Sequence, residues 1–374
     1  MYYASICAIA KDEDKNLREW VLYHFAIGFE HIVIYDNNSK NPIKNILSEF
    51  ISNGLITVFD LDMDKAQQLS AYLHCLNKWG SNSYWIAFID IDEFIVPINK
   101  NDIKDILDDY RDYGGLGITW KIFSSNGHVC RPKGRTIENY FNAIELNSHI
   151  KSIVRPKLTV RPLSPHHFLY KNGYYCVNED YIPIKNFSSY PLSEKICINH
   201  YYYKSQQDFE EKINRGRATQ AKTNVNINMD MFYRHLSREC TEDKTIFKFL
   251  KILNTYEKYP INILHNIVKG DIIYDINIGI EKIIAECKSD NIIAAKKLYS
   301  RLSRYSDAFE LHIIGIKLAL LARDKEKALK LLQKEMSRHD IGCEELEFCY
   351  KELSRYYTLK KKNMISESIL KMID

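Results

Sequence analysis

The chain has 374 residues, which suggests two domains, and 45% of them are apolar, enough for a packed core. Its net charge of +4 is too small to indicate a nucleic-acid partner, and its nine cysteines include no Cys-x-x-Cys pair, so neither a zinc site nor a disulfide framework is predicted. No apolar run reaches the length of a transmembrane segment, and residues 1–10 lack the basic start of a signal peptide. We therefore expect a cytoplasmic protein, peripheral at the inner face of a membrane if it meets one.

Residues 1 to about 120 alternate predicted strands and helices. The expected strands cover residues 3–10, 31–36, 56–60 and 85–90, with helices between them. Such alternation predicts an α/β fold with a mostly parallel central sheet and helices on both faces. Ligands bind at the carboxyl ends of the strands in sheets of this kind. Asp36 and Asp90 stand at two of these ends, so we expect them to face one crevice.

Three acids follow the apolar run of the fourth strand, in the segment Asp90-Ile91-Asp92-Glu93. Residues i and i+2 of an extended segment point to the same side, so Asp90 and Asp92 can present two carboxylates to one point. Hard cations such as Mg²⁺ and Mn²⁺ bind through carboxylates and substrate phosphates, so the pattern favours a divalent metal site. A helix cap or loop start is the structural alternative. Glu93 is either a third acid of the metal shell or an acid that orients the loop.

Two segments follow with different patterns. Residues 121–235 are rich in aromatic, histidine and basic residues, which suggests short strands, loops and one helix that closes over the crevice. From about residue 240 the pattern is helical, with a weak 34-residue repeat of the tetratricopeptide period, for which ordinary amphipathic helices are the alternative. We expect domains at 1–235 and 236–374. The run Lys360-Lys361-Lys362 is either a solvated tail or a contact for anionic lipid.

A series of sequence blocks runs in order through residues 4 to 220. The blocks are Cys7-Ala8-Ile9-Ala10-Lys11-Asp12-Glu13, Leu17-x-Glu19-Trp20-x-x-Tyr23-His24, Ile34-Tyr35-Asp36-Asn37-x-Ser39, Trp85-x-x-Phe88-Ile89-Asp90-Ile91-Asp92-Glu93-Phe94, Trp120-x-x-Phe123-x-Ser125-x-Gly127-His128, Lys151-x-Ile153-x-Arg155-Pro156 and Asn199-His200-Tyr201-x-x-Lys204-Ser205. Together they resemble glycosyltransferase family 92 and its bacterial family-2-like relatives. One departure is Ser124, where the family often has glycine after the phenylalanine.

The resemblance implies a GT-A type fold in which residues 1–120 form the nucleotide and metal half and residues 121–235 the acceptor half. The C-terminal all-helical domain expected at 236–374 lies outside the resemblance. It implies a metal-dependent glycosyltransferase of polysaccharide biosynthesis that moves a sugar from a UDP-sugar to a glycan or lipid-linked acceptor. The favoured sugar is galactose, and the favoured reaction inverts the configuration of the anomeric carbon. The implied nucleotide-sugar residues are Lys11, Glu13, Asp36, Gln68, Asp90, Lys204, Lys212 and Arg215. The implied ligands of Mn²⁺ or Mg²⁺ are Asp90, Asp92 and His200.

An inverting displacement also needs a general base, and the favoured carboxylates are Asp180 and Glu179, which follow an aromatic segment. The expected acceptor contacts are Trp120, Phe123, His128 and His167, and each has an alternative as a core or loop residue. The alternative function is a catalytically silent binding module that recruits partners through its helical C-terminus. A nucleotide-sugar hydrolase or pyrophosphorylase is a third hypothesis, and no Gly-rich phosphate loop supports the latter.

Overall fold

The computed structural model describes residues 1–61, 68–215 and 227–258, and beyond them 283–284, 286, 289, 291–302, 314–319 and 327–328. The chain divides into two compact units, Met1–Val268 and Lys269–Asp374. In the second unit, helix α12 (Ile292–Leu302) contributes Ala295 to a small apolar cluster with Ile283, Ile314 and Leu318. Most of the predicted 34-residue repeat, and all of the Lys360-Lys361-Lys362 run, lie outside the described residues.

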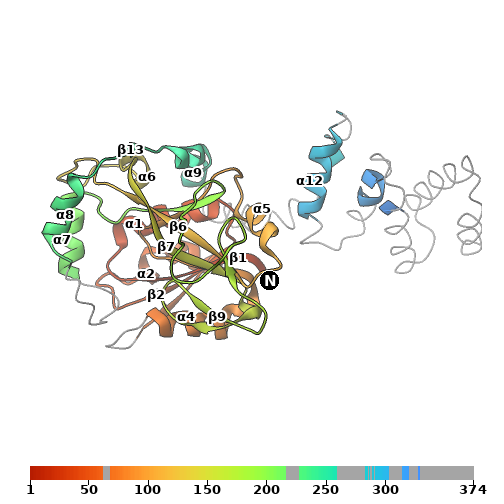
Figure 1. Ribbon diagram of the computed structural model, residues 1–374, viewed down its shortest axis with the longest axis horizontal. Coiled ribbons are helices and arrows are strands. Elements are labelled where there is room, and N and C mark those ends of the chain that lie inside the picture. The colour runs from red at the N-terminus through yellow and green to blue at the C-terminus, as the bar shows by residue number, and fades with distance from the viewer. Residues whose placement is uncertain are drawn as a thin grey trace, which may run out of the picture. The chain divides into compact units, whose positions relative to one another are not determined.

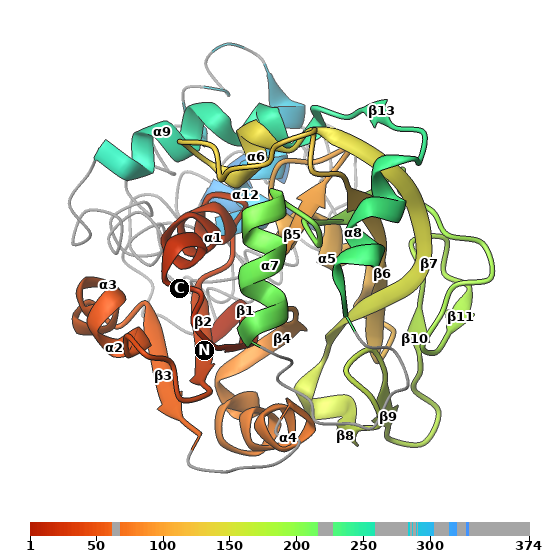
Figure 2. The same ribbon diagram turned by 90° about the vertical axis from the view of Figure 1, so that its left-hand side faces the viewer.

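A sheet of eleven described strands forms the centre of the first unit (Figure 1 and Figure 2). Its strands are β1 (Tyr2–Ala10), β2 (His31–Asp36), β3 (Ile56–Asp60), β4 (Ser83–Phe88), β5 (Glu93–Pro97), β6 (Gly115–Phe123), β7 (Asn142–Val154), β10 (Cys176–Val177), β11 (Pro183–Ile184), β12 (Ile196–His200) and β13 (Thr241–Glu242). The spatial order is β11-β10-β6-β7-β4-β1-β2-β3, with β12 pairing to β5 and β6 and β13 to β7. A separate pair is formed by β8 (Thr159–Pro162) and β9 (Phe168–Tyr170).

The strands β3, β2, β1 and β4 are mutually parallel, and antiparallel pairing enters through β7. Buried parallel strands read as nearly continuous apolar runs, and every residue of β1 after the first is buried. The register places Ala10 beside Asp36 and Asp36 beside Asp60, so these carboxyl ends share one edge of the sheet. The predicted α/β class with a parallel central sheet is confirmed.

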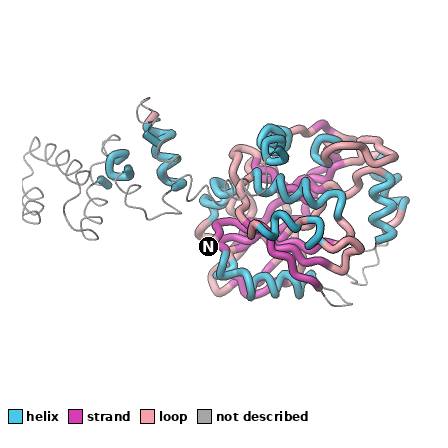
Figure 3. The backbone as a smooth tube through the Cα atoms, turned by 180° about the vertical axis from the view of Figure 1, so that it is seen from behind, coloured by secondary structure: helices cyan, strands magenta, loops and turns pink. Residues whose placement is uncertain are grey.

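Helices cover both faces of this sheet, and they enclose the strands of the first unit in Figure 3. Helix α4 (Gln68–Trp79) packs Ala71, Tyr72 and Cys75 onto β1 and β2, and α1 (Asp14–Ala26) lies on the other side of the sheet (Figure 1 and Figure 2). The other helices of this unit are α2 (Ile43–Ile46), α3 (Ser48–Ser52), α5 (Ile103–Leu107), α6 (Thr136–Asn139), α7 (Gln206–Arg215), α8 (Met229–Leu236) and α9 (Leu250–Lys258), with 3₁₀ turns at Gly80–Asn82, Asp108–Tyr110, Pro156–Leu158 and Thr245–Phe249. None of the described helices combines the length and apolar character needed to span a membrane.

The acid segment differs from the extended strand that was predicted for it. Strand β4 ends at Phe88 and β5 begins at Glu93, and the backbone N–H of Glu93 donates to the carbonyl of Asp90 at 3.1 Å. The chain therefore turns between the two strands. Asp90 and Asp92 do not alternate along one strand, and each carboxylate reaches a different set of partners.

The first unit also extends beyond the boundary predicted at residue 235. The 3₁₀ turn at Thr245–Phe249 and α9 pack onto α1, where the rings of Phe249 and Tyr23 lie 5.7 Å apart. Arg135 adds an ion pair of 2.5 Å to Glu257 of α9. The described residues 236–258 accordingly belong to the first unit, where Ile246, Phe249 and Leu253 are buried.

Candidate active site

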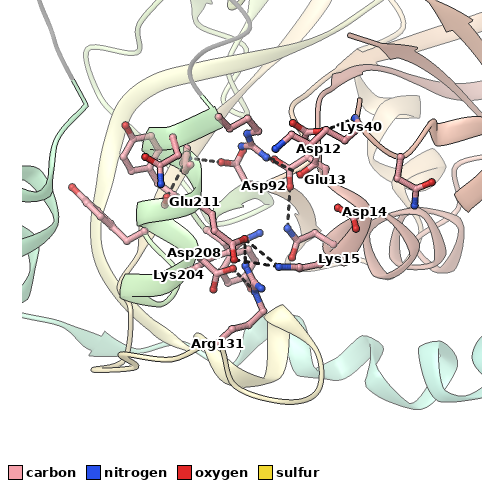
Figure 4. A pocket seen from close by; sticks show the side chains of 18 residues that line it. Asp12, Glu13, Asp14, Lys15, Lys40, Asp92, Arg131, Lys204, Asp208 and Glu211 are labelled. Carbon is pink, nitrogen blue, oxygen red and sulfur yellow. Dashed lines mark hydrogen bonds and ion pairs between the residues drawn. The ribbon is translucent and has the colours of Figure 1, made fainter. Parts of the chain in front are cut away.

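A charged cleft opens at the carboxyl ends of the parallel strands, bordered by α7. Two adjoining hollows of about 430 and 320 Å³ form this cleft. Both are lined by Glu13, Asp92, Tyr202, Lys212 and Arg215. Figure 4 shows the larger hollow, where acidic and basic side chains of the loop before α1 face those of α7. This is the edge at which α/β sheets bind their ligands.

Asp90 lies in a buried network around Lys151. The Lys151 ammonium, on a side chain that is 1% exposed, lies 2.7 Å from Asp90 Oδ2 and 3.5 Å from Glu93 Oε2. Gln68 donates to Asp90 Oδ1 at 3.0 Å, and Glu93 Oε2 accepts the backbone N–H of Asp90 at 2.9 Å. Burial raises the pKa of Glu93 to about 8, although the charge of Lys151 lowers it. Glu93 is fully buried, so it orients the turn and does not face the cleft.

Asp92 is held from α7 and from the end of β12. The Lys212 ammonium donates to Asp92 Oδ2 at 2.8 Å, and His200 Nε2 lies 3.5 Å from Oδ1. Lys212 also lies 3.7 Å from the centre of the Tyr202 ring, a cation–π contact. Burial alone would raise the pKa of Asp92, but Lys212 and His200 outweigh it and hold that pKa well below its usual range. Asp92 is therefore a carboxylate at neutral pH.

Ion pairs fix α7 as one wall of the cleft. Arg215 pairs with Glu13 at 2.5 Å, and Arg131 pairs with Asp208 at 2.5 Å and with Glu211 at 2.6 Å. Ion pairs at partly exposed positions contribute little stability each, about 0–1 kcal/mol. The fully buried Phe209, packed on Tyr203 and Phe232, anchors α7 in the core as well.

Two residues of the larger hollow have a left-handed backbone. Asp12 and Lys204 each have φ of +51°, a region that non-glycine residues seldom occupy. Both line the hollow. Such strained positions cost about 1–3 kcal/mol each. Asn38, Asn126 and Tyr181 share this conformation and lie outside both hollows, so it does not single out the cleft.

Asp90 and Asp92 offer carboxylate oxygens, the type of ligand that hard divalent ions prefer. Among the described residues, however, no three His, Cys, Asp or Glu side chains gather as a ready-made metal site. The four carboxylate oxygens already have partners, namely Gln68, Lys151, His200 and Lys212. His200 Nδ1 is buried and has no hydrogen-bond partner within the part of the chain that the structure describes. These residues fit an ion that is held by carboxylates together with substrate phosphates, once Lys212 leaves Asp92.

Residues 2–238 match the family described as Glycosyltransferase family 92. The chain belongs to glycosyltransferase family 92. The family resemblance predicted from the sequence blocks is thereby confirmed. Similar curated proteins include a family 92 protein of Oryza sativa subsp. japonica, 29% identical over 220 residues, and one of Ricinus communis, 30% identical over 222 residues. The matches cover 57% of this chain but only 35% and 38% of those two relatives.

A shorter similarity links the chain to galactan beta-1,4-galactosyltransferase GALS2 of Arabidopsis thaliana, 26% identical over 122 residues, which are 30% of this chain and 23% of that protein. Among solved structures, S. aureus TarS 1-349 in complex with UDP-GlcNAc is similar with a TM-score of 0.29 and 13% identity, covering 90% of this chain and 91% of that one.

Most of the residues predicted to bind the nucleotide sugar and the metal lie in the charged cleft. The predicted residues that line one or both hollows are Lys11, Glu13, Gln68, Asp90, Asp92, Trp120, His200, Lys204, Lys212 and Arg215. They come from separate elements, from the loop after β1 to the last turn of α7. The Trp120 ring lies 4.5 Å from the ring of His200, which places the predicted acceptor tryptophan beside Asp92.

Glu179 and Asp180, the predicted general bases, lie outside the two hollows of the cleft. The Glu179 carboxylate accepts three backbone N–H groups at the amino end of β12, from Glu194, Lys195 and Ile196. Asp180 is exposed and pairs with Lys195 at 3.2 Å. His200 stands at the other end of β12, and the usual rise of a strand puts its Cα about 13 Å from that of Ile196. Glu179 therefore fixes the start of a strand, far from the cleft.

Four other predicted residues lie outside the cleft. Both Asp36 oxygens accept backbone N–H groups, from Ser39 at 3.0 Å and Ile43 at 2.9 Å, so Asp36 stabilises its own loop. Phe123 is fully buried in the core. The His128 ring packs on Tyr140 with centres 5.6 Å apart, and His167 lines a different hollow, described below.

Sequence reasoning missed Lys151, Tyr202 and Arg131 as parts of the site. Lys151 stands in a sequence block of the family, but the block alone gives no partner for its charge. A lysine between the apolar residues Ile150 and Ile153, in the buried last part of β7, was the available signal, because such a charge needs a buried acid. Nothing in the local sequence marks Arg131.

Proposed function

We propose that this family 92 protein transfers a sugar from a UDP-sugar to a hydroxyl group of a glycan or glycolipid acceptor. The observation that carries the proposal is the Asp92 carboxylate, held between Lys212 and His200 inside a cleft at the carboxyl ends of parallel strands. Lys11, Lys204 and Arg215 supply further positive charge to the same cleft. Clustered cationic side chains suit the diphosphate of a nucleotide sugar.

We also propose that Asp90, Asp92 and His200 hold Mn²⁺ or Mg²⁺ together with the diphosphate. When bound, such an ion supplies positive charge against the departing diphosphate. Lys212 then exchanges its contact with Asp92 for a phosphate oxygen, a short movement for a flexible side chain. Lys151 and Gln68 hold Asp90 in place through this exchange, because each binds one of its oxygens and both residues are buried.

In the proposed reaction, the acceptor hydroxyl oxygen bonds to the anomeric carbon while the bond from that carbon to the β-phosphate oxygen breaks. UDP leaves with the bonding electron pair, and a base accepts the hydroxyl proton. Trp120 lies beside His200 and can stack on the transferred sugar. Galactose as the sugar, inversion at the anomeric carbon, a role in surface polysaccharide synthesis and a cytoplasmic location remain predictions.

The test is a UDP-release assay on the full chain with a panel of UDP-sugars, each with Mn²⁺ and with EDTA. We expect turnover with one or a few donors, and loss of that turnover in EDTA. A catalytically silent binding module would release no UDP from any donor under either condition, and that result would end the proposal.

A further inference from the structure

A third hollow, of about 620 Å³, lies next to the cleft, and we call it the aromatic groove. Six large apolar side chains that line it are 39–75% exposed: Leu169, Tyr174, Tyr175, Ile182, Phe187 and Tyr190. Among the described residues of its lining, Lys185 is the only lysine, arginine or acid. An exposed apolar concavity of this kind marks a binding surface. Its chemistry is the opposite of the charged cleft beside it.

The cleft and the aromatic groove share one thin wall. Pro165 and His166 line the cleft, while the next two residues, His167 and Phe168, line the groove. Consecutive Cα atoms are about 3.8 Å apart, so the two hollows adjoin. Hydrogen bonds fix the wall, since His166 Nδ1 bonds the carbonyl of Ile150 at 2.7 Å and Ser152 Oγ donates to the carbonyl of His166 at 2.7 Å.

A row of ring contacts connects the same two hollows. The ring of His200, beside Asp92, lies 4.5 Å from Trp120, and Trp120 stacks on His149 at 5.1 Å. His149 in turn contacts Phe187 at 4.7 Å, on the border of the groove. The backbones of His149 and Phe187 also pair as an isolated β-bridge, which fixes this border to β7. Aromatic side chains therefore continue from the charged cleft into the aromatic groove.

We propose that the aromatic groove binds the neutral sugars of a glycan chain whose end is the acceptor in the cleft. This inference rests on the proposed function and narrows its acceptor to a polymer. Exposed tyrosines suit neutral sugars, because a ring face covers the apolar side of a pyranose while the hydroxyl bonds to its polar edge. A membrane surface fits less well, because interfacial binding combines apolar residues with many lysines and arginines on a convex or flat face.

The experiment measures binding of galactan, glucan and mannan oligosaccharides of two to eight sugars to the full chain by calorimetry, without any donor. The variant is Tyr174→Ala/Tyr190→Ala, and the control is Tyr233→Ala, a tyrosine of α8 that is 52% exposed and outside the groove. We expect affinity that rises with chain length in the wild type and in the control. The double variant should bind the longest oligosaccharide at least about tenfold more weakly, which corresponds to about 1.4 kcal/mol.

The proposal is overturned if no oligosaccharide of the three series binds the wild type, or if the double variant binds as tightly as the control. Binding to phosphatidylcholine–phosphatidylglycerol vesicles that the double variant loses, with no glycan binding, would assign the groove to a lipid surface instead. UDP titrations of the same samples keep the two proposals apart. If the double variant loses glycan binding but keeps UDP binding, the change affects the groove alone. If the wild type does not bind UDP, the proposed donor site is wrong.

Discussion

Asp92→Asn is expected to lower UDP release by about 100- to 1,000-fold, the usual loss when one group of a preorganised electrostatic site is removed. Asparagine keeps the shape of the side chain but removes the charge that faces Lys212 and His200. The fold should persist, because Asp92 lies in a turn at the cleft and not in the apolar core. Turnover is measured with the best UDP-sugar and Mn²⁺, and folding by thermal unfolding.

The matched control is Asp60→Asn, an acid at the same edge of the sheet whose side chain is 63% exposed and pairs with Lys44. It should keep turnover within a factor of about 2, since exposed pairs contribute little. Full activity of Asp92→Asn would remove Asp92 from the proposed metal and diphosphate site.

Lys151→Met is expected to lower the free energy of unfolding by about 3–5 kcal/mol, the cost of leaving a buried acid without its partner. Lys151 compensates both Asp90 and Glu93, and its side chain is 1% exposed. Methionine has a side chain of similar length but carries no charge. Urea unfolding of the wild type and the variant measures the loss directly.

A double-mutant cycle separates this charge effect from a packing defect. Adding Asp90→Asn to Lys151→Met should recover part of the lost stability, because the carboxylate that Lys151 contacts at 2.7 Å is then replaced by a neutral amide. The surface control Lys44→Met, whose lysine is 50% exposed, should change stability by less than about 1 kcal/mol. Equal unfolding midpoints for Lys151→Met and Lys44→Met would contradict the buried network.

The parallel half of the fold was predictable because its signals are local. The buried strand at Tyr2–Ala10 and the helix at Asp14–Ala26, with Leu17, Trp20 and Val21 on its buried face, both follow from apolar spacing. The turn at the acid pair was hidden, because the apolar residues of Glu93–Pro97 continue the run of β4 and make two strands look like one. Asp90 and Asp92 could be singled out because acids in an apolar segment are energetically costly. The extended backbone predicted for them was wrong.

The acceptor half was less predictable because its geometry depends on strand direction. β12 runs parallel to β6, which carries His200 into the cleft and leaves Glu179 at the opposite end. No spacing in the sequence reveals that direction. For the same reason the contact of Lys212 with Asp92, 120 positions apart in the chain, emerges only in the folded protein.

We propose that the cleft between the acid turn and α7 holds a nucleoside diphosphate together with a divalent ion. Calorimetric titration of UDP into the full chain, with Mn²⁺ and then with EDTA, tests it most directly. We expect Mn²⁺ to strengthen UDP binding at least about tenfold, or about 1.4 kcal/mol, and Asp92→Asn to abolish this gain. Equal UDP affinity with Mn²⁺ and with EDTA, or no UDP binding in either, would contradict it.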